Sequence, residues 1–137
     1  EPVIGSDLYP TIMQMIGKGV RPAKDIDGKS LLPLLLGKKK NLHSELCWFY
    51  PQYSPQAQMP GGAIRKGDYK LIEFYDPQKI ELYNLKNDLG EKYDLSKEEP
   101  DKVEELKKYF NKWLKKMNPI MYTLNPNYQK DYRENSE

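Results

Sequence analysis

Residues 44–85 constrain the fold most, because their strand-like segments are joined by very short connections. Four segments in this region are rich in strand-forming residues, namely 45–50, 62–66, 69–75 and 80–85. The second and third are separated only by Gly67-Asp68, a two-residue hairpin signal, and a turn at 76–79 leads into the fourth. Short connections favour antiparallel neighbours, so the sequence predicts a four-stranded antiparallel meander.

A long amphipathic helix is predicted at 100–117. Pro100 suits the first helical position, and Lys115 and Lys116 lie near the negative end of the helix dipole. Its apolar side chains recur every three or four residues, and they are Val103, Leu106, Phe110, Trp113, Leu114 and Met117. We expect these side chains to be buried against the sheet, which gives an α+β fold.

The predicted sheet needs cover on both faces. In the third strand Leu71 and Ile72 are both apolar, and successive strand residues point to opposite faces. One helix covers one face, so part of the other face must meet something else.

A first helix is predicted within residues 5–17, started by Ser6 or Asp7 and ended by Gly17. Its apolar residues occupy more than one face, and they are Leu8, Ile12, Met13, Met15 and Ile16. Such a helix needs cover from several directions. We therefore assign 1–43 to the end of a missing domain and a connector, including a short helix at 30–37. Residues 44–117 form the sheet-and-helix unit, and 118–137 an extended tail.

Composition excludes several classes of protein. The 22 basic and 20 acidic residues leave a net charge of +2, which provides no strong field for nucleic acid or an anionic membrane. No apolar run approaches the roughly 20 residues needed to span a bilayer. A single cysteine, Cys47, and a single histidine, His43, argue against a disulfide framework and a Cys- or His-rich metal site. We interpret Cys47 as a small buried hydrophobe and His43 as a loop or surface residue, and assign no catalytic or metal-binding residue.

The aromatic cluster formed by Trp48, Phe49, Tyr50 and Tyr53 has two interpretations. Strand alternation cannot bury all four on one face, so one or two should stay near a surface or an interface. They either pack in the core and a domain contact, or form a sugar-stacking or substrate-lining rim.

Six segments resemble, in the same order, the C-terminal portion of the formylglycine-dependent sulfatases, arylsulfatase-like enzymes of the alkaline phosphatase superfamily. They are residues 1–17, 25–37, 47–53, 62–75, 80–95 and the helix ending near Trp113. The resemblance implies that the first segment closes a large α/β catalytic domain. It also implies that the remainder is a small subdomain with a four-stranded antiparallel sheet packed on a long helix.

That resemblance places the chemistry elsewhere. The family nucleophile lies in a Cys/Ser-x-Pro-x-Arg motif and becomes formylglycine, whereas Cys47 is followed by Trp-Phe-Tyr. Formylglycine and calcium are thus expected in the full-length parent, in its own N-terminal catalytic domain. This piece would stabilise that domain, line one side of the substrate cleft and be inactive alone. The parent would hydrolyse a sulfated carbohydrate or an aryl sulfate, and be periplasmic or secreted.

One departure from the family pattern suggests candidate substrate contacts. Many members read Trp-His-Tyr-Pro-His-Tyr where this chain has residues 48–53, and those histidines lie towards the substrate. By that correspondence Phe49 and Gln52 are the leading substrate-binding candidates, with Tyr50 and Tyr53 behind them. Two alternatives stay open: an autonomous carbohydrate-binding module, and the same subdomain from a phosphodiesterase or phosphonate hydrolase of the superfamily.

Overall fold

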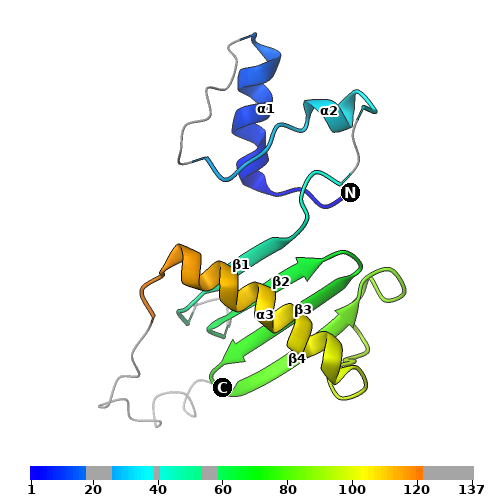
Figure 1. Cartoon of the computed structure of the whole chain (residues 1–137), viewed down its shortest axis with the longest axis vertical. Coiled ribbons are helices and arrows are strands. Elements are labelled where there is room, and N and C mark those ends of the chain that lie inside the picture. The colour runs from blue at the N-terminus through cyan, green and yellow to red at the C-terminus, as the bar shows by residue number, and fades with distance from the viewer. Residues whose placement is uncertain (18–25, 39–40, 54–58, 122–137) are drawn as a thin grey trace, which may run out of the picture.

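The computed structural model describes residues 1–17, 26–38, 41–53 and 59–121, and the statements below concern these residues. Most of the tail predicted at 118–137 lies outside them. Figure 1 shows a helical part above a sheet with one long helix across it. The helical part contains a 3-10 turn (Gly5–Asp7), α1 (Leu8–Met15) and α2 (Leu32–Leu35). The other part contains β1 (Leu46–Tyr50), β2 (Gly61–Lys66), β3 (Tyr69–Tyr75), β4 (Gln78–Asn84) and α3 (Pro100–Met117). The predicted α+β fold class is confirmed.

The sheet is an antiparallel meander with the strand order β1-β2-β3-β4, as predicted. Lys66 pairs with Tyr69 across the predicted Gly67-Asp68 turn, and Gly67 has a φ of 59°. A positive φ at the first central position is the pattern of a type II′ hairpin turn. Strand β4 starts earlier than expected, because its ladder already pairs Gln78 with Tyr75 across a cis Asp76–Pro77 bond.

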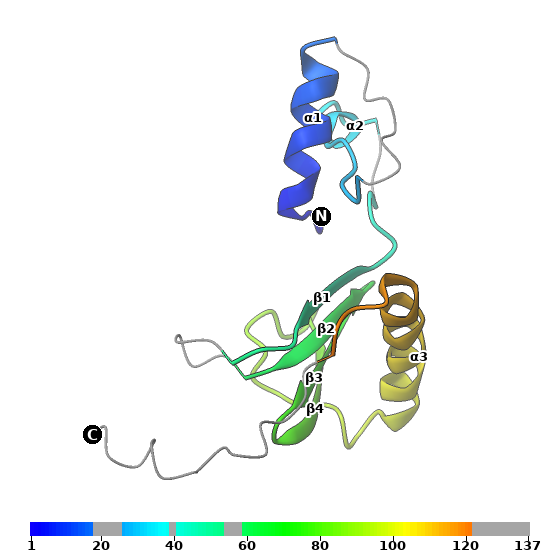
Figure 2. The same ribbon diagram turned by 90° about the vertical axis from the view of Figure 1, so that its left-hand side faces the viewer.

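The core lies between one face of the sheet and α3, as Figure 2 shows with the sheet nearly edge-on. Its fully buried members come from three strands and the helix. They are Ile64 of β2, Leu71 of β3, Leu82 of β4, and Leu106 and Phe110 of α3. Burial of each such side chain contributes about 1.5–3 kcal/mol before entropy is subtracted. The expectation that Met117 is buried is wrong: it is 49% exposed, in the last helical turn, away from Phe110.

Gly62 sets how closely α3 approaches the sheet. A Cβ at this position would lie 2.3 Å from Phe110 Cζ and 3.1 Å from the Trp48 carbonyl oxygen. The Phe110 ring occupies the space that any other side chain would fill, and it also stacks on Trp113 at 5.9 Å between centroids. The glycine therefore permits the contact on which the core depends.

The outer edge of β4 is closed by the segment that follows it. The Leu82 N–H donates to Asp94 Oδ1 at 3.0 Å, and the Leu95 N–H donates to the Leu82 carbonyl at 2.8 Å. Burial works to raise the pKa of Asp94, but the hydrogen bonds from Leu82 and Ser96 outweigh it and lower the pKa below its ordinary value. An edge covered in this way offers fewer free backbone groups for pairing with another chain.

The helical part is organised around the buried carboxylate of Asp7. Its oxygens accept hydrogen bonds from Ile4 N–H at 3.0 Å, Lys29 N–H at 2.8 Å and His43 Nε2 at 2.8 Å. His43 lies in the loop before β1, as one part of the expectation had it, but its side chain is only 7% exposed and is paired with Asp7, so it is not a surface residue. We call Asp7, Lys29 and His43 the Asp7 clasp. It joins the start of α1 to the segments on either side of α2.

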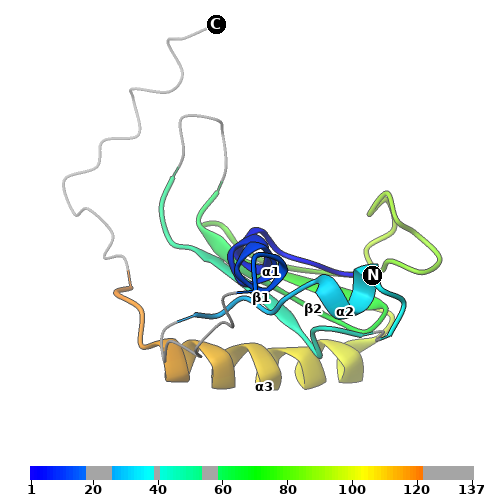
Figure 3. The same ribbon diagram turned by 90° about the horizontal axis from the view of Figure 1, so that it is seen from above.

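The hydroxyl of Thr11 extends the same network. It donates to the Asp7 carbonyl at 2.6 Å and accepts from the Leu31 N–H at 2.8 Å. Figure 3, the view from above, shows α1 end-on with α2 beside it. Within the described segments, no helix is long and apolar enough to cross a membrane.

Replacing Gly62 with alanine should destabilise the sheet-and-helix part. Phe110 must move to admit the methyl group, and overpacking of this kind costs about 1–3 kcal/mol. Urea unfolding followed by tryptophan fluorescence measures the change. Gly5→Ala is the control, since a Cβ there meets nothing within 4 Å. A Gly62→Ala protein as stable as the Gly5→Ala protein would contradict this account.

Replacing Asp7 with asparagine should increase local unfolding of the helical part at neutral pH. Burial raises the pKa of Asp7, yet the hydrogen bonds from Lys29, Ile4 and His43 bring it below its ordinary value of 3.8. The ionised carboxylate therefore stabilises the fold fully above about pH 4 and progressively less as pH falls through the lowered pKa. Breaking a buried pair costs about 3 kcal/mol.

Hydrogen exchange at the Ile4 and Lys29 amides is the measurement for this prediction. At pH 7 exchange at these amides should be much faster in Asp7→Asn than in the wild type, and well below pH 4 the two proteins should converge. Asp27→Asn, which alters an exposed carboxylate nearby, should behave as wild type. Equal protection of Asp7→Asn and wild type at pH 7 would rule out the clasp as a stabilising feature.

Candidate functional site

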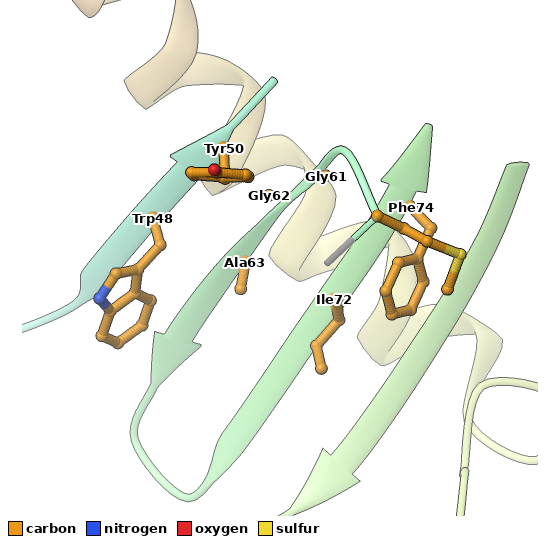
Figure 4. Close-up of a pocket in the computed structure, with 8 residues that line it drawn as sticks. Trp48, Tyr50, Gly61, Gly62, Ala63, Ile72 and Phe74 are labelled. Carbon is orange, nitrogen blue, oxygen red and sulfur yellow. The ribbon is translucent and has the colours of Figure 1, made fainter. Parts of the chain in front are cut away.

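The sheet face opposite α3 carries a shallow depression of about 370 Å³. We call it the open face, and Figure 4 shows its side chains on β1, β2 and β3 with α3 behind the sheet. The residues that line the depression are Trp48, Tyr50, Met59, Gly61, Gly62, Ala63, Ile72 and Phe74. Its walls are aromatic and aliphatic, and its floor is formed by small residues.

Strand alternation and register produce this arrangement. Cys47 faces the core, so its neighbour Trp48 points to the open face, as does Tyr50. Trp48 stands opposite Ala63, which stands opposite Ile72. Because Ala63 is small and stands between the larger Trp48 and Ile72, a depression remains between them. No described element covers these side chains, and Trp48 and Tyr50 are both exposed.

The four predicted substrate-binding residues do not lie together in the structure. Phe49 points to the α3 side of the sheet and packs on Tyr75, with 6.1 Å between ring centroids. Tyr50 lies on the open face and lines the depression. Gln52 is exposed beyond β1, and the exposed Tyr53 donates its hydroxyl to Asp76. Phe49 and Tyr50 are therefore on opposite faces, and substrate contact by these four residues stays a prediction.

More of the aromatic cluster is exposed than expected. One or two of its members were predicted near the surface, whereas Trp48, Tyr50 and Tyr53 are all exposed. The sequence reasoning also missed Ile72 and Phe74 as neighbours of Trp48 and Tyr50. The Gly67-Asp68 turn predicts that Ala63 faces Ile72, because a two-residue hairpin fixes the register of β2 and β3. It does not fix the register of β1 on β2, which brings Trp48 next to Ala63.

The thiol of Cys47 is unsuited to nucleophilic chemistry. Burial, and then the negative charge of Glu45, raise its pKa to about 12. It stays protonated at neutral pH, whereas the thiolate is the reactive form. Among the described residues, no group of three His, Cys, Asp or Glu side chains is placed to hold a metal ion.

Charges at the margin of the open face are mostly compensated within the chain. Lys70 Nζ lies 2.7 Å from Glu91, and Lys79 Nζ lies 2.6 Å from Glu81. Glu81 also accepts the Tyr83 hydroxyl at 2.9 Å. Burial, followed by that hydrogen bond, raises the pKa of Tyr83 to about 12. Ionisable groups do not converge on the apolar depression, so its chemistry suits contact with another surface.

Sequence comparison relates this chain to the C-terminal parts of sulfatases. Residues 1–119 match the family described as N-sulphoglucosamine sulphohydrolase, C-terminal. The chain is 37% identical over 103 residues to a sulfatase of Formosa agariphila, covering 69% of this chain and 19% of that protein. It is 33% identical over 93 residues to a Δ4,5-hexuronate-2-O-sulfatase of Bacteroides thetaiotaomicron, covering 67% of this chain and 19% of the relative. The chain thus spans about a fifth of the length of these curated relatives.

Solved structures show the same fold. A sulfatase structure from Bacteroides thetaiotaomicron, itself described as putative, superposes with a TM-score of 0.71 at 25% identity, over 88% of this chain and 27% of the other. The phosphonate monoester hydrolase of Agrobacterium radiobacter superposes with a TM-score of 0.54 at 20% identity, over 82% and 24% of the two chains. The match over residues 1–119 shows that this chain belongs to the C-terminal family of the sulfatases.

Proposed function

We propose that the chain is the C-terminal part of a sulfatase that hydrolyses sulfate esters. In this role it packs against the catalytic domain, stabilises it and lines one side of its substrate cleft, and it is inactive alone. The family match and the 19% share of two longer sulfatases support the proposal.

The observation that carries the proposal is the inverted burial of α1. Its inward side holds the polar residues Asp7 and Thr11, both buried. Apolar side chains of α1 and of the residue that caps it are more than half exposed, as the 57% exposure of Ile12 illustrates; they are Leu8, Tyr9, Ile12, Met15 and Ile16. Contiguous exposed apolar surface of this kind marks a contact with another protein surface. A catalytic domain that precedes the chain would cover it.

The open face is the second surface of this kind. It presents exposed Trp48 and Tyr50 around an apolar hollow, and α3 already occupies the opposite face of the sheet. Covering the open face would turn a sheet buried on one side into one buried on both, which adds hydrophobic stabilisation to the whole sulfatase.

The reactive groups belong to the catalytic domain in this proposal. Formylglycine and calcium would be held there, as the resemblance to the formylglycine-dependent sulfatases implies. The substrate would be a sulfated carbohydrate or an aryl sulfate. Phe49, Gln52, Tyr50 and Tyr53 stay the sequence-based candidates for contact with it, although Phe49 and Tyr50 lie on opposite faces of the sheet and cannot both contact it from the same face. The enzyme would act in the periplasm or outside the cell, as expected for a sulfatase that degrades glycans.

Exposed Trp48 and Tyr50 favour a second candidate, an autonomous carbohydrate-binding module, since aromatic rings stack on sugars. A phosphonate hydrolase parent shares the fold but is not favoured by the family match. Calorimetry of the chain with sulfated and unsulfated glycans separates the first two: sub-millimolar binding by the chain alone would favour the module.

The chain alone should not hydrolyse 4-nitrophenyl sulfate with calcium present, because it contains no formylglycine motif. The longer gene product that includes the preceding catalytic domain should show turnover. Release of 4-nitrophenol measures both. Clear turnover by the 137-residue chain would overturn the proposal.

Replacing Ile12 with lysine should lower the yield of folded, active full-length sulfatase, because the charge would be buried against the catalytic domain. The stability of the 137-residue chain should hardly change, since Ile12 is exposed in it. Thermal unfolding and activity of both forms are measured. Tyr93→Lys, at a 72% exposed position after β4, is the matched control. Equal behaviour of the two full-length variants would argue against docking through α1.

A further inference from the structure

Arg65 lies on the open face with an incomplete set of partners. It sits in β2 between Leu46 of β1 and Lys70 of β3. Its Nε is buried and has no hydrogen-bond partner among the described residues. Nearby lysines are satisfied within the chain: Lys70 contacts both carboxylate oxygens of Glu91 at 2.7 and 2.8 Å, and Lys66 contacts Glu45 at 3.0 Å.

This arrangement is costly for the chain by itself. A guanidinium stays charged at any working pH, and its planar fork of donors matches a carboxylate in a bidentate geometry. A buried donor that lacks an acceptor loses the hydrogen bond it would make with water. The ion pairs of the described residues involve other cations, so no acidic side chain described here compensates Arg65.

Arg65 is nevertheless accessible to a group from outside. It lines two depressions, of about 350 and 360 Å³. In the second, Trp48 and Leu89 form apolar walls, while Lys70 and Glu91 neutralise each other. Arg65 thus supplies the uncompensated charge of this depression, and an entering group of opposite charge would be favoured.

We infer that Arg65 is an interdomain anchor, which pairs with a carboxylate side chain of the sulfatase catalytic domain. The inference rests on the docking role proposed above. A protein carboxylate fits better than a free anion because the surrounding surface is apolar: Trp48 and Tyr50 on the open face and Leu89 beside it are exposed. A docking domain would cover them and exclude water from the ion pair, which strengthens it. A small anion would leave them in water.

The first test is the stability of the 137-residue chain. Arg65→Met should leave the midpoint of thermal unfolding unchanged or raise it, because it removes a buried donor that lacks an acceptor. Lys70→Met, which breaks the contact with Glu91, should not raise it. A clear fall in the midpoint for Arg65→Met would mean that Arg65 is already satisfied within the chain, and the inference would fail.

The second test is binding of the chain to the catalytic domain of the longer sulfatase proposed above, once circular dichroism and a cooperative thermal transition have shown that this domain is folded by itself. Arg65→Met should weaken binding by about 10- to 150-fold, the worth of a hydrogen bond to a charged group. The affinity of Arg65→Lys should lie between those of the wild type and Arg65→Met, because lysine keeps the charge but lacks the planar set of guanidinium donors. Lys79→Met removes a cation that Glu81 already pairs, and should have little effect.

The outcomes separate the two proposals. If the wild-type chain does not bind the catalytic domain, the docking role itself is wrong. If the wild-type chain binds and the Arg65→Met and Lys79→Met variants have the same affinity for the catalytic domain, the docking role is supported and the anchor role of Arg65 is wrong. Calorimetry with inorganic sulfate and with glucuronate provides the third arm, where we expect no sub-millimolar binding. Sub-millimolar binding abolished by Arg65→Met would assign the residue to a small anion and overturn the anchor.

Discussion

A four-stranded sheet with apolar side chains on both faces has only one described helix to cover it, and the other features follow from that imbalance. Phe110 and Leu106 of α3 fill one face, and Gly62 lets the Phe110 ring reach the backbone of the sheet. The opposite face keeps Trp48, Tyr50 and Phe74 around an apolar hollow. A two-layer unit of this size is stable through its single core, while its other face is suited to association.

The helical part also leaves apolar side chains exposed, but for a different physical reason. Polar groups usually lie outside a small fold and apolar groups inside, but here the Asp7 clasp directs the polar side of α1 inward. The backbone donors it satisfies, on Ile4 and Lys29, hold these segments together. The apolar side chains of α1 are consequently presented outward. The described residues therefore expose two apolar surfaces, one on α1 and one on the open face.

The fold of this chain is not restricted to one type of enzyme. The same sheet-and-helix arrangement occurs in a sulfatase structure and in a phosphonate monoester hydrolase. Such a fold does not by itself decide which reaction is catalysed, because function depends on the site and not on the fold.

The strands, the two short turns, α3 and the antiparallel strand order could all be predicted from the amino-acid sequence, because they depend on periodicity and turn chemistry between near neighbours. The start of β4 was displaced slightly, since its first pairs form across the turn at Asp76–Pro77. The tertiary structure alone decided that His43 is buried on Asp7, that Met117 is exposed and that Arg65 Nε lacks an acceptor among the described residues. These outcomes depend on which segments distant in the chain meet, and a side chain's local sequence carries no record of the partner it finds there.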